Sequence, residues 1–334
     1  MQSKQRSEWV DVSKGILILL VVYAHSAAIQ IYSDYHTLIY WFHMPAFFVL
    51  SGLFHKEVNN ITDLKLWWSS RCKDQVKYYA LFILSIYTYR SIFVTSDYLD
   101  MITELKNVVL GGRYIDGYYA PIWFITCLLF TQLLFNIVTL VSSRTWIRLV
   151  IIFLLFILAH IESKFFPQLK IPLNIDVSLF SLFFFSCGYY LKNHMNNLTL
   201  GLICVVGLLF TISNVKNGQF SYFLDLKQHS YHNTILDAII PLFGTGTVFL
   251  ISYLIGKEGL LFRLFSYLGR HSLNIMYLHL IMAIELKKII LYSGLPYFLI
   301  IGVISPIIII SILSNIKVFY INRLHALLYK NKYL

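Results

Sequence analysis

Residues 9–26 read WVDVSKGILILLVVYAHS, an apolar run whose only charged or imidazole side chains are Asp11, Lys14 and His25. A helix turns 100° per residue, so the eleven steps from Lys14 to His25 return both side chains to within roughly 20° on one face. They stand about 16 Å apart along the axis. The stretch therefore predicts a first membrane helix with a cation near the surface and an imidazole at membrane depth, which suits a long anionic molecule with a reactive far end.

The whole chain has the composition of a membrane protein. Its 334 residues are 58% hydrophobic and 13% charged, whereas soluble domains carry about 25% charged residues. Several stretches of about 17 residues or more hold few charges, which is long enough to cross a bilayer core. The sequence predicts one all-α integral membrane domain over residues 1–334 with about ten transmembrane helices. The expected spans are 13–32, 38–55, 78–94, 121–141, 146–162, 175–192, 198–214, 234–255, 272–290 and 296–316.

The net charge of +11 indicates membrane topology and argues against nucleic acid as a partner. No basic stripe alternates with base-stacking aromatic residues in a soluble domain. With the N-terminus inside, most of the 27 Lys and Arg residues fall on cytoplasmic segments, so both termini are expected in the cytoplasm. The same charges suit anionic lipid of a bacterial cytoplasmic membrane. The four cysteines lack metal-ligand spacing, so no metal is predicted.

Three connections carry polar residues. Segment 69–77 (SSRCKDQVK) is expected to be a cytoplasmic loop, and its Arg71 and Lys73 stand on the side of Lys14, where they suit phosphate binding. Two long outer loops are expected at 95–120 and 215–233. Asp116 lies in the first of these, within GGRYIDGYY, a mixture of tyrosine and carboxylate that suits sugar hydroxyls or, equally, an interfacial aromatic belt.

Several side chains at membrane depth are candidates for chemistry. His25 suits a general base, since neutral imidazole serves this role near pH 7. Asp11 either holds Lys14 in place or favours the helix start. In the second span, His43 lies at a depth comparable to His25, Pro45 is expected to kink the helix, and Ser51 with the following glycine permits close helix packing.

Two later motifs add cavity candidates. Trp123 begins the fourth span and either lines the cavity or anchors at the interface. His279 lies in the ninth span, where a catalytic and a structural role are both open. Arg90, His160 and Glu162 lie near outer span ends and are interpreted as snorkelling side chains.

The ordered set of motifs resembles the membrane acyltransferase 3 family. The matching stretches are 11–25 (DVSKGILILLVVYAH), 42–52 (FHMPAFFVLSG), 121–124 (PIWF) and 268–279 (LGRHSLNIMYLH). The first carries the family's pattern of a basic residue, ten spacers and a histidine, here Lys14 to His25. Arg71 and Lys73 resemble its basic pair, with Lys in one position where Arg is frequent.

The resemblance implies that His25 is the essential catalytic residue and that an acyl group, usually acetyl, passes from cytoplasmic acyl-CoA to a hydroxyl of an extracytoplasmic surface glycan or lipid-linked sugar. Acetyl-CoA is then the donor that Lys14, Arg71 and Lys73 bind. Two alternatives stay open, namely a transporter or flippase of lipid-linked glycan and a non-catalytic partner of a polysaccharide synthase. The acceptor sugar, direct transfer or an acyl-histidine intermediate, and the oligomeric state are left undetermined.

Overall fold

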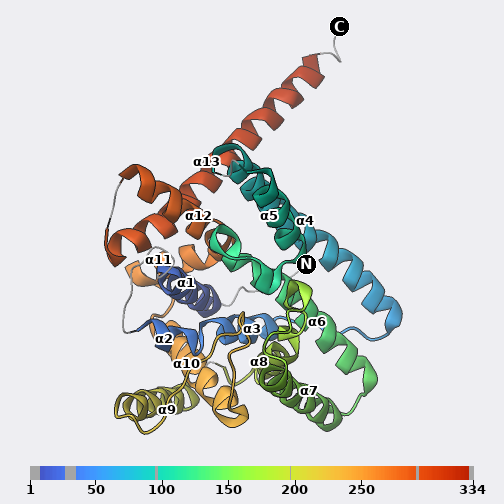
Figure 1. Cartoon of the computed structure of the whole chain (residues 1–334), viewed down its shortest axis with the longest axis vertical. Coiled ribbons are helices and arrows are strands. Elements are labelled where there is room, and N and C mark those ends of the chain that lie inside the picture. Colours follow the sequence, from blue (N-terminus) through green and yellow to red (C-terminus); the bar gives the residue numbers. More distant parts are fainter. Residues whose placement is uncertain (1–7, 27–34, 95–96, 196, 291–292, 331–334) are drawn as a thin grey trace.

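Helix α1 (Glu8–Ala24) lies near the centre of a helical bundle (Figure 1). The computed structural model describes residues 8–26, 35–94, 97–195, 197–290 and 293–330, and within these ranges no β-strand forms. The other elements in chain order are α2 (His36–Tyr40), α3 (His43–Leu53), α4 (Ile61–Phe93), α5 (Tyr98–Leu110), η2 (Gly112–Tyr114), η3 (Gly117–Ile122), α6 (Trp123–Val141), α7 (Thr145–Phe165), η4 (Pro172–Asn174), α8 (Val177–Tyr190), α9 (Leu198–Lys216), α10 (Thr234–Leu254), α11 (Gly259–Arg270), α12 (Ser272–Ile290) and α13 (Leu295–Lys330).

Five helical segments in the described part of the chain are long and apolar enough to cross a membrane. They are Gly117–Val141, Thr145–Phe165, Leu198–Lys216, Thr234–Leu254 and Leu295–Ile312. The prediction of an all-α membrane fold is therefore confirmed, whereas ten spans and cytoplasmic termini stay predictions. Helices α1, α3 and α8 fall outside this set with 17, 11 and 14 residues. They are largely buried, and interior helices need not be apolar on every side because neighbouring helices shield them from lipid.

The predicted second span is two helices in the structure. Helix α2 ends at Tyr40 and α3 begins at His43, so Pro45 lies in the first turn of α3. Proline is tolerated there, but its ring clashes with the carbonyl of the fourth residue before it and it has no N–H to donate. The break at Trp41 and Phe42 therefore replaces the expected kink within one span.

Two predicted loops were wrong in part. Segment 69–77 lies inside α4, which runs unbroken for 33 residues because Asn60 caps it and no glycine or proline interrupts it. Lys, Arg and Gln are good helix formers, so the polar side chains of this segment do not interrupt the helix. The outer segment 95–120 contains α5, which Asp97 caps and which ends where Gly111 adopts a φ of +61°. Between α9 and α10, the chain is irregular, with one isolated bridge from Asp225 to Ser230.

Glycines let the central helices touch. A Cβ on Gly15 would lie 2.0 Å from the carbonyl oxygen of Phe265 in α11, and a Cβ on Gly52 would lie 2.0 Å from that of Phe185 in α8. Gly188 makes the reciprocal approach to α3. Such close contacts are typical of membrane helices, where packing of small residues replaces the hydrophobic effect. The contacts fix α1 and α3, and with them Lys14 and Ser51.

Candidate active site

A cavity of about 650 Å³ opens beside the first half of α1. Lys14 of α1, Ser51 of α3 and Arg71 of α4 all line it, so the structure brings together three residues that the sequence singled out. Lys14 is half-buried and Arg71 is exposed. Lys73 is not among the lining residues. It lies two residues after Arg71 on α4, so its side chain is rotated about 200° from that of Arg71 around the helix axis.

The rest of this inner cavity combines apolar residues with the polar side chains of Asp74, Gln75 and Gln132. Phe47, Phe124 and Leu128 are among its walls. His43 lies one helical turn before Phe47, and the buried Trp123 packs beside Phe124 with ring centroids 6.3 Å apart. The apolar wall therefore continues from the cations of the cavity towards the histidines. Asp11 is also buried, and its carbonyl meets α11 where a Cβ on Gly269 would lie 1.8 Å away.

Three imidazoles gather beyond the end of α1. The Nε2 atom of His279 lies 3.3 Å from Nδ1 of His25, and their ring centroids are 5.0 Å apart. His43 lies close enough to His25 for the two to interact electrostatically. His279 and His43 are buried and His25 is only half-buried, so His25 is the most accessible of the three.

Backbone carbonyls determine where these rings carry their protons. Nδ1 of His25 donates to the carbonyl of Val21 at 2.9 Å, and Nδ1 of His279 to that of Ile275 at 2.9 Å. A carbonyl only accepts, so in each neutral ring the proton is on Nδ1 and Nε2 has a lone pair. The single Nδ1–H of His25 is then shared between the Val21 carbonyl, its nearer acceptor, and Nε2 of His279 at 3.3 Å. The arrangement leaves Nε2 of His25 as the basic atom.

Lys227 and Asp116 lie on the other side of His25 from Lys14. The buried Lys227 ammonium donates to the carbonyl of Ile115 at 2.5 Å and to the Asp116 carboxylate at 2.6 Å. Its charge acts on His25. An ammonium has three N–H groups, and those two bonds use two of them. The Asp116 side chain remains 74% exposed, so this ion pair has one face open to a ligand.

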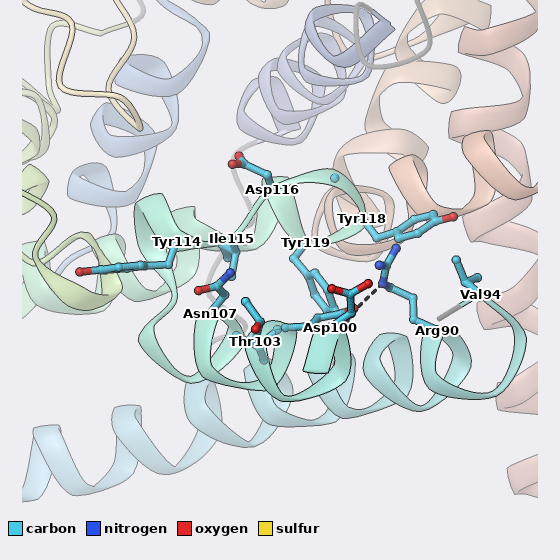
Figure 2. Close-up of a pocket in the computed structure, with 13 residues that line it drawn as sticks. Arg90, Val94, Asp100, Thr103, Asn107, Tyr114, Ile115, Asp116, Tyr118 and Tyr119 are labelled. Carbon is cyan, nitrogen blue, oxygen red and sulfur yellow. Dashed lines mark hydrogen bonds and ion pairs between the residues drawn. The ribbon is translucent and has the colours of Figure 1, made fainter. Parts of the chain in front are cut away.

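A second, polar pocket of about 570 Å³ lies next to this ion pair, between the end of α4, α5 and the η2–η3 segment (Figure 2). Arg90, Asp100 and Tyr119 gather at one side of it, and Asp116 lies apart from them. Arg71 of the inner cavity and Arg90 of this outer pocket are 19 residues apart on one continuous helix, α4. That separation is about 28 Å along the axis, which is close to the thickness of a bilayer core of about 30 Å.

A third polar site is a buried charged cluster. Glu162, Asp176 and His229 place ligand atoms within 4.8 Å of one another, as a metal site requires. However, the Arg113 guanidinium lies 3.4 Å from Asp176 Oδ2, and His229 Nε2 lies 3.1 Å from the same oxygen. The arginine already supplies positive charge to this carboxylate, so we interpret the cluster as a structural clasp.

Sequence reasoning missed Lys227 and the outer pocket. Lys227 is the only Lys or Arg between Lys216 and Lys257, and an isolated cation in a predicted outer loop was a signal that could have marked it. Arg90 does not simply snorkel, because it forms a salt bridge with Glu104 at 2.7 Å. Likewise, His160 is buried against Asp237 at 3.1 Å. No local pattern reveals such partners, which come from other helices and loops.

Taken together, the fold and site define an integral membrane protein with a cation-bearing cavity, a separate polar pocket and a histidine cluster that lines neither of them. A family model described as an acyltransferase domain, that of the acyltransferase 3 family, matches residues 7–315. The chain therefore belongs to the acyltransferase 3 family and is a membrane acyltransferase. No curated protein and no solved structure matches it significantly.

Proposed function

We propose that this acyltransferase moves an acetyl group from cytoplasmic acetyl-CoA to a hydroxyl of an extracytoplasmic surface glycan or lipid-linked sugar. The observation that carries the proposal is the position of His25. Its Nε2 is the basic atom, and it follows directly on α1, whose Lys14 lines the inner cavity. It is also close enough to interact with the charge of Lys227, which is paired with Asp116 of the outer pocket.

The inner cavity has the features that acetyl-CoA requires. Lys14 and Arg71 would bind its phosphates, and Arg does so with paired hydrogen bonds. The apolar walls at Phe47 and Phe124 would surround the long arm that carries the thioester towards His25. Lys73 remains a candidate for the same phosphates from outside the cavity. Keeping the phosphates at this end avoids the large cost of moving charge through hydrocarbon.

The chemistry needs one proton transfer in each direction. Nε2 of His25 takes the proton of the acceptor hydroxyl as its oxygen forms a bond to the thioester carbonyl carbon. The carbon–sulfur bond then breaks, and the leaving thiolate receives the proton from His25. His279 holds the ring through Nδ1–H and stabilises the imidazolium, while the Lys227 ammonium stabilises negative charge on oxygen.

Replacement of His25 by alanine tests this function. Purified protein in lipid nanodiscs is given labelled acetyl-CoA and glycan, and transferred acetyl is counted. We expect His25→Ala to reduce the rate by about 10² to 10⁴, the usual cost of losing a general base. His194→Ala, which changes an exposed histidine outside the site, is the matched control and should retain activity.

The same assay separates the alternatives. A flippase consumes no acetyl-CoA, and a non-catalytic partner transfers nothing when purified alone. Acetyl transfer by His25→Ala at the rate of the unchanged protein would overturn the mechanism.

A further inference from the structure

The outer pocket has a one-sided distribution of charge. Its charged lining residues are three carboxylates, those of Asp100, Glu104 and Asp116, and one cation, Arg90. Arg90 is paired with Glu104 at 2.7 Å, and Asp116 with Lys227 at 2.6 Å. These two ion pairs are neutral overall. The third carboxylate, Asp100, therefore gives the pocket a net negative charge.

Two tyrosine rings of this pocket are held in place by carboxylates, one of them a lining residue and one from α12. The Tyr119 hydroxyl donates to Glu104 at 2.6 Å, and the Tyr118 hydroxyl donates to Glu285 of α12. Arg90 lies 4.9 Å above the Tyr118 ring. Figure 2 shows Asp100, Tyr119 and Arg90 gathered at one side of the pocket, with Thr103 and Asn107 further along it. Rigid aromatic walls with a few fixed polar groups are typical of small-ligand sites.

The polar atoms in this lining are mainly hydrogen-bond acceptors. Ionised carboxylates accept and do not donate, so Asp100 and the second oxygen of Glu104 suit the hydroxyl and amide N–H donors of a sugar. A uronic acid or sialic acid would place a further carboxylate against them. At about 5 Å in a partly exposed site, like charges repel strongly enough to weaken binding about tenfold or more.

We propose that this pocket binds the acceptor glycan through neutral sugar units and discriminates against acidic sugars. The inference rests on the proposed function, and it adds the site and the substrate class. Ile115 and Asp116 connect the pocket to the reaction centre. Both residues line the pocket, and both accept a hydrogen bond from Lys227. The charge of Lys227 in turn interacts with His25. A sugar in the pocket therefore positions a neighbouring hydroxyl towards His25.

The test compares matched panels of neutral and uronic-acid oligosaccharides of equal length. Transfer is measured with the unchanged protein, and binding is measured by saturation-transfer NMR on His25→Ala, which does not need turnover. We expect neutral glycans to be preferred about tenfold or more in both measurements. Asp100→Lys should remove or reverse the preference.

Asp63→Lys is the matched control. Asp63 is the third residue of α4, which Asn60 caps, and Asp100 is the third residue of α5, which Asp97 caps. Both changes place a lysine in the first turn of a helix, and Asp63→Lys also removes a bond from Asn60 at 3.1 Å, so the control is at least as disruptive. Of the two residues, only Asp100 lines the pocket. An unchanged preference in Asp63→Lys supports the assignment.

Each failure has its own signature. Absence of acetyl transfer to every glycan would reject the proposed function, while the binding preference of His25→Ala would still decide the pocket. Transfer with equal use of acidic glycans, or a preference that Asp100→Lys leaves intact, would overturn the pocket and leave the transferase in place. Failure of His25→Ala to bind any neutral glycan would also overturn it.

Discussion

At the residue scale, the reactivity of His25 depends on the contacts of its Nδ1 atom. That atom donates to the Val21 carbonyl and lies 3.3 Å from Nε2 of His279. A proton arriving at Nε2 makes the ring cationic, and both contacts of the Nδ1–H then become charge-assisted and stronger. In the proposed mechanism, His279 would therefore be a positioning residue that favours the imidazolium form of His25.

Replacing His279 should lower kcat with little effect on the affinity for acetyl-CoA. We expect His279→Ala to reduce kcat by about tenfold or more, because the loss of a hydrogen bond to a charged group costs about 1.5–3 kcal/mol. His279→Gln offers an amide oxygen at the reach of Nε2 and should recover part of the loss. Steady-state kinetics with labelled acetyl-CoA measures both parameters.

His160→Ala is the control for this change. His160 is buried and also donates through Nδ1 to the carbonyl four residues earlier, but it faces Asp237 away from the reaction centre. It should reduce the amount of folded protein and leave kcat per folded molecule unchanged. If His279→Ala raised only KM, or if His279→Gln gave no recovery, the positioning role would be wrong.

Arg71 and Lys73 can be separated by their places on α4. Arg71 lines the inner cavity and Lys73 does not. We expect Arg71→Ala to raise KM for acetyl-CoA about tenfold, because a charge-assisted hydrogen bond to phosphate is lost, with KM for the glycan unchanged. Lys73→Ala should have a smaller effect. A larger rise in KM for Lys73→Ala would place the phosphates outside the cavity.

At the element scale, the clasp joins three segments that are far apart in sequence. Arg113 comes from η2, Asp176 precedes α8, and His229 lies in the connection between α9 and α10. The backbone reaches the clasp through left-handed conformations, at φ +53° for Asn174 and +56° for His229. Such conformations cost about 1–3 kcal/mol each and persist where surrounding contacts hold them. The clasp therefore holds the segment that carries Lys227.

Breaking the clasp on one side should destabilise the protein. We expect Arg113→Met to lower the free energy of unfolding by about 3–5 kcal/mol, because the buried Asp176 carboxylate loses its cation. Thermal unfolding in detergent provides the measurement. The double variant Arg113→Met/Asp176→Leu removes both charges and should recover part of the loss. If Arg113→Met were as stable as the unchanged protein, the Arg113–Asp176 ion pair would not be needed for stability.

At the scale of the whole molecule, the two cavities contact different parts of α4. The inner cavity contacts the middle of this unbroken helix, from Arg71 to Tyr78, and the outer pocket contacts its end at Arg90. In the proposed reaction the charged donor would bind in the first and the acceptor in the second. Only the acyl group would then move between them.

Labelling of introduced cysteines tests this sidedness. In a background without the four native cysteines, which are free thiols, we expect Lys14→Cys and Arg71→Cys to react with an impermeant maleimide from the cytoplasmic side. Asp116→Cys should react from outside. Acetyl-CoA should protect position 14 and leave position 116 reactive. Labelling of positions 14 and 116 from the same side would contradict transfer across the membrane.

Much of the protein could be predicted from local sequence. Apolar runs and helix period lie within single segments and are enough to predict an all-helical membrane protein. The acyltransferase activity and the role of His25, which directly follows the first helix, came from the resemblance of four motifs to the acyltransferase 3 family. The break before α3 and the helical state of segment 69–77 were less accessible. They depend on where one proline falls and on whether a charged stretch continues a neighbouring helix.

Only the tertiary structure decided which side chains meet. His279 contacts His25 across 254 positions of sequence, and Lys227 bonds to Ile115 across 112. Within a membrane, helix pairing depends on close approach of small residues and on buried polar partners, neither of which has a periodic signal. The sequence by itself therefore determined the helices and the catalytic candidate, whereas the helix packing determined the proton on His25, the clasp and the two cavities.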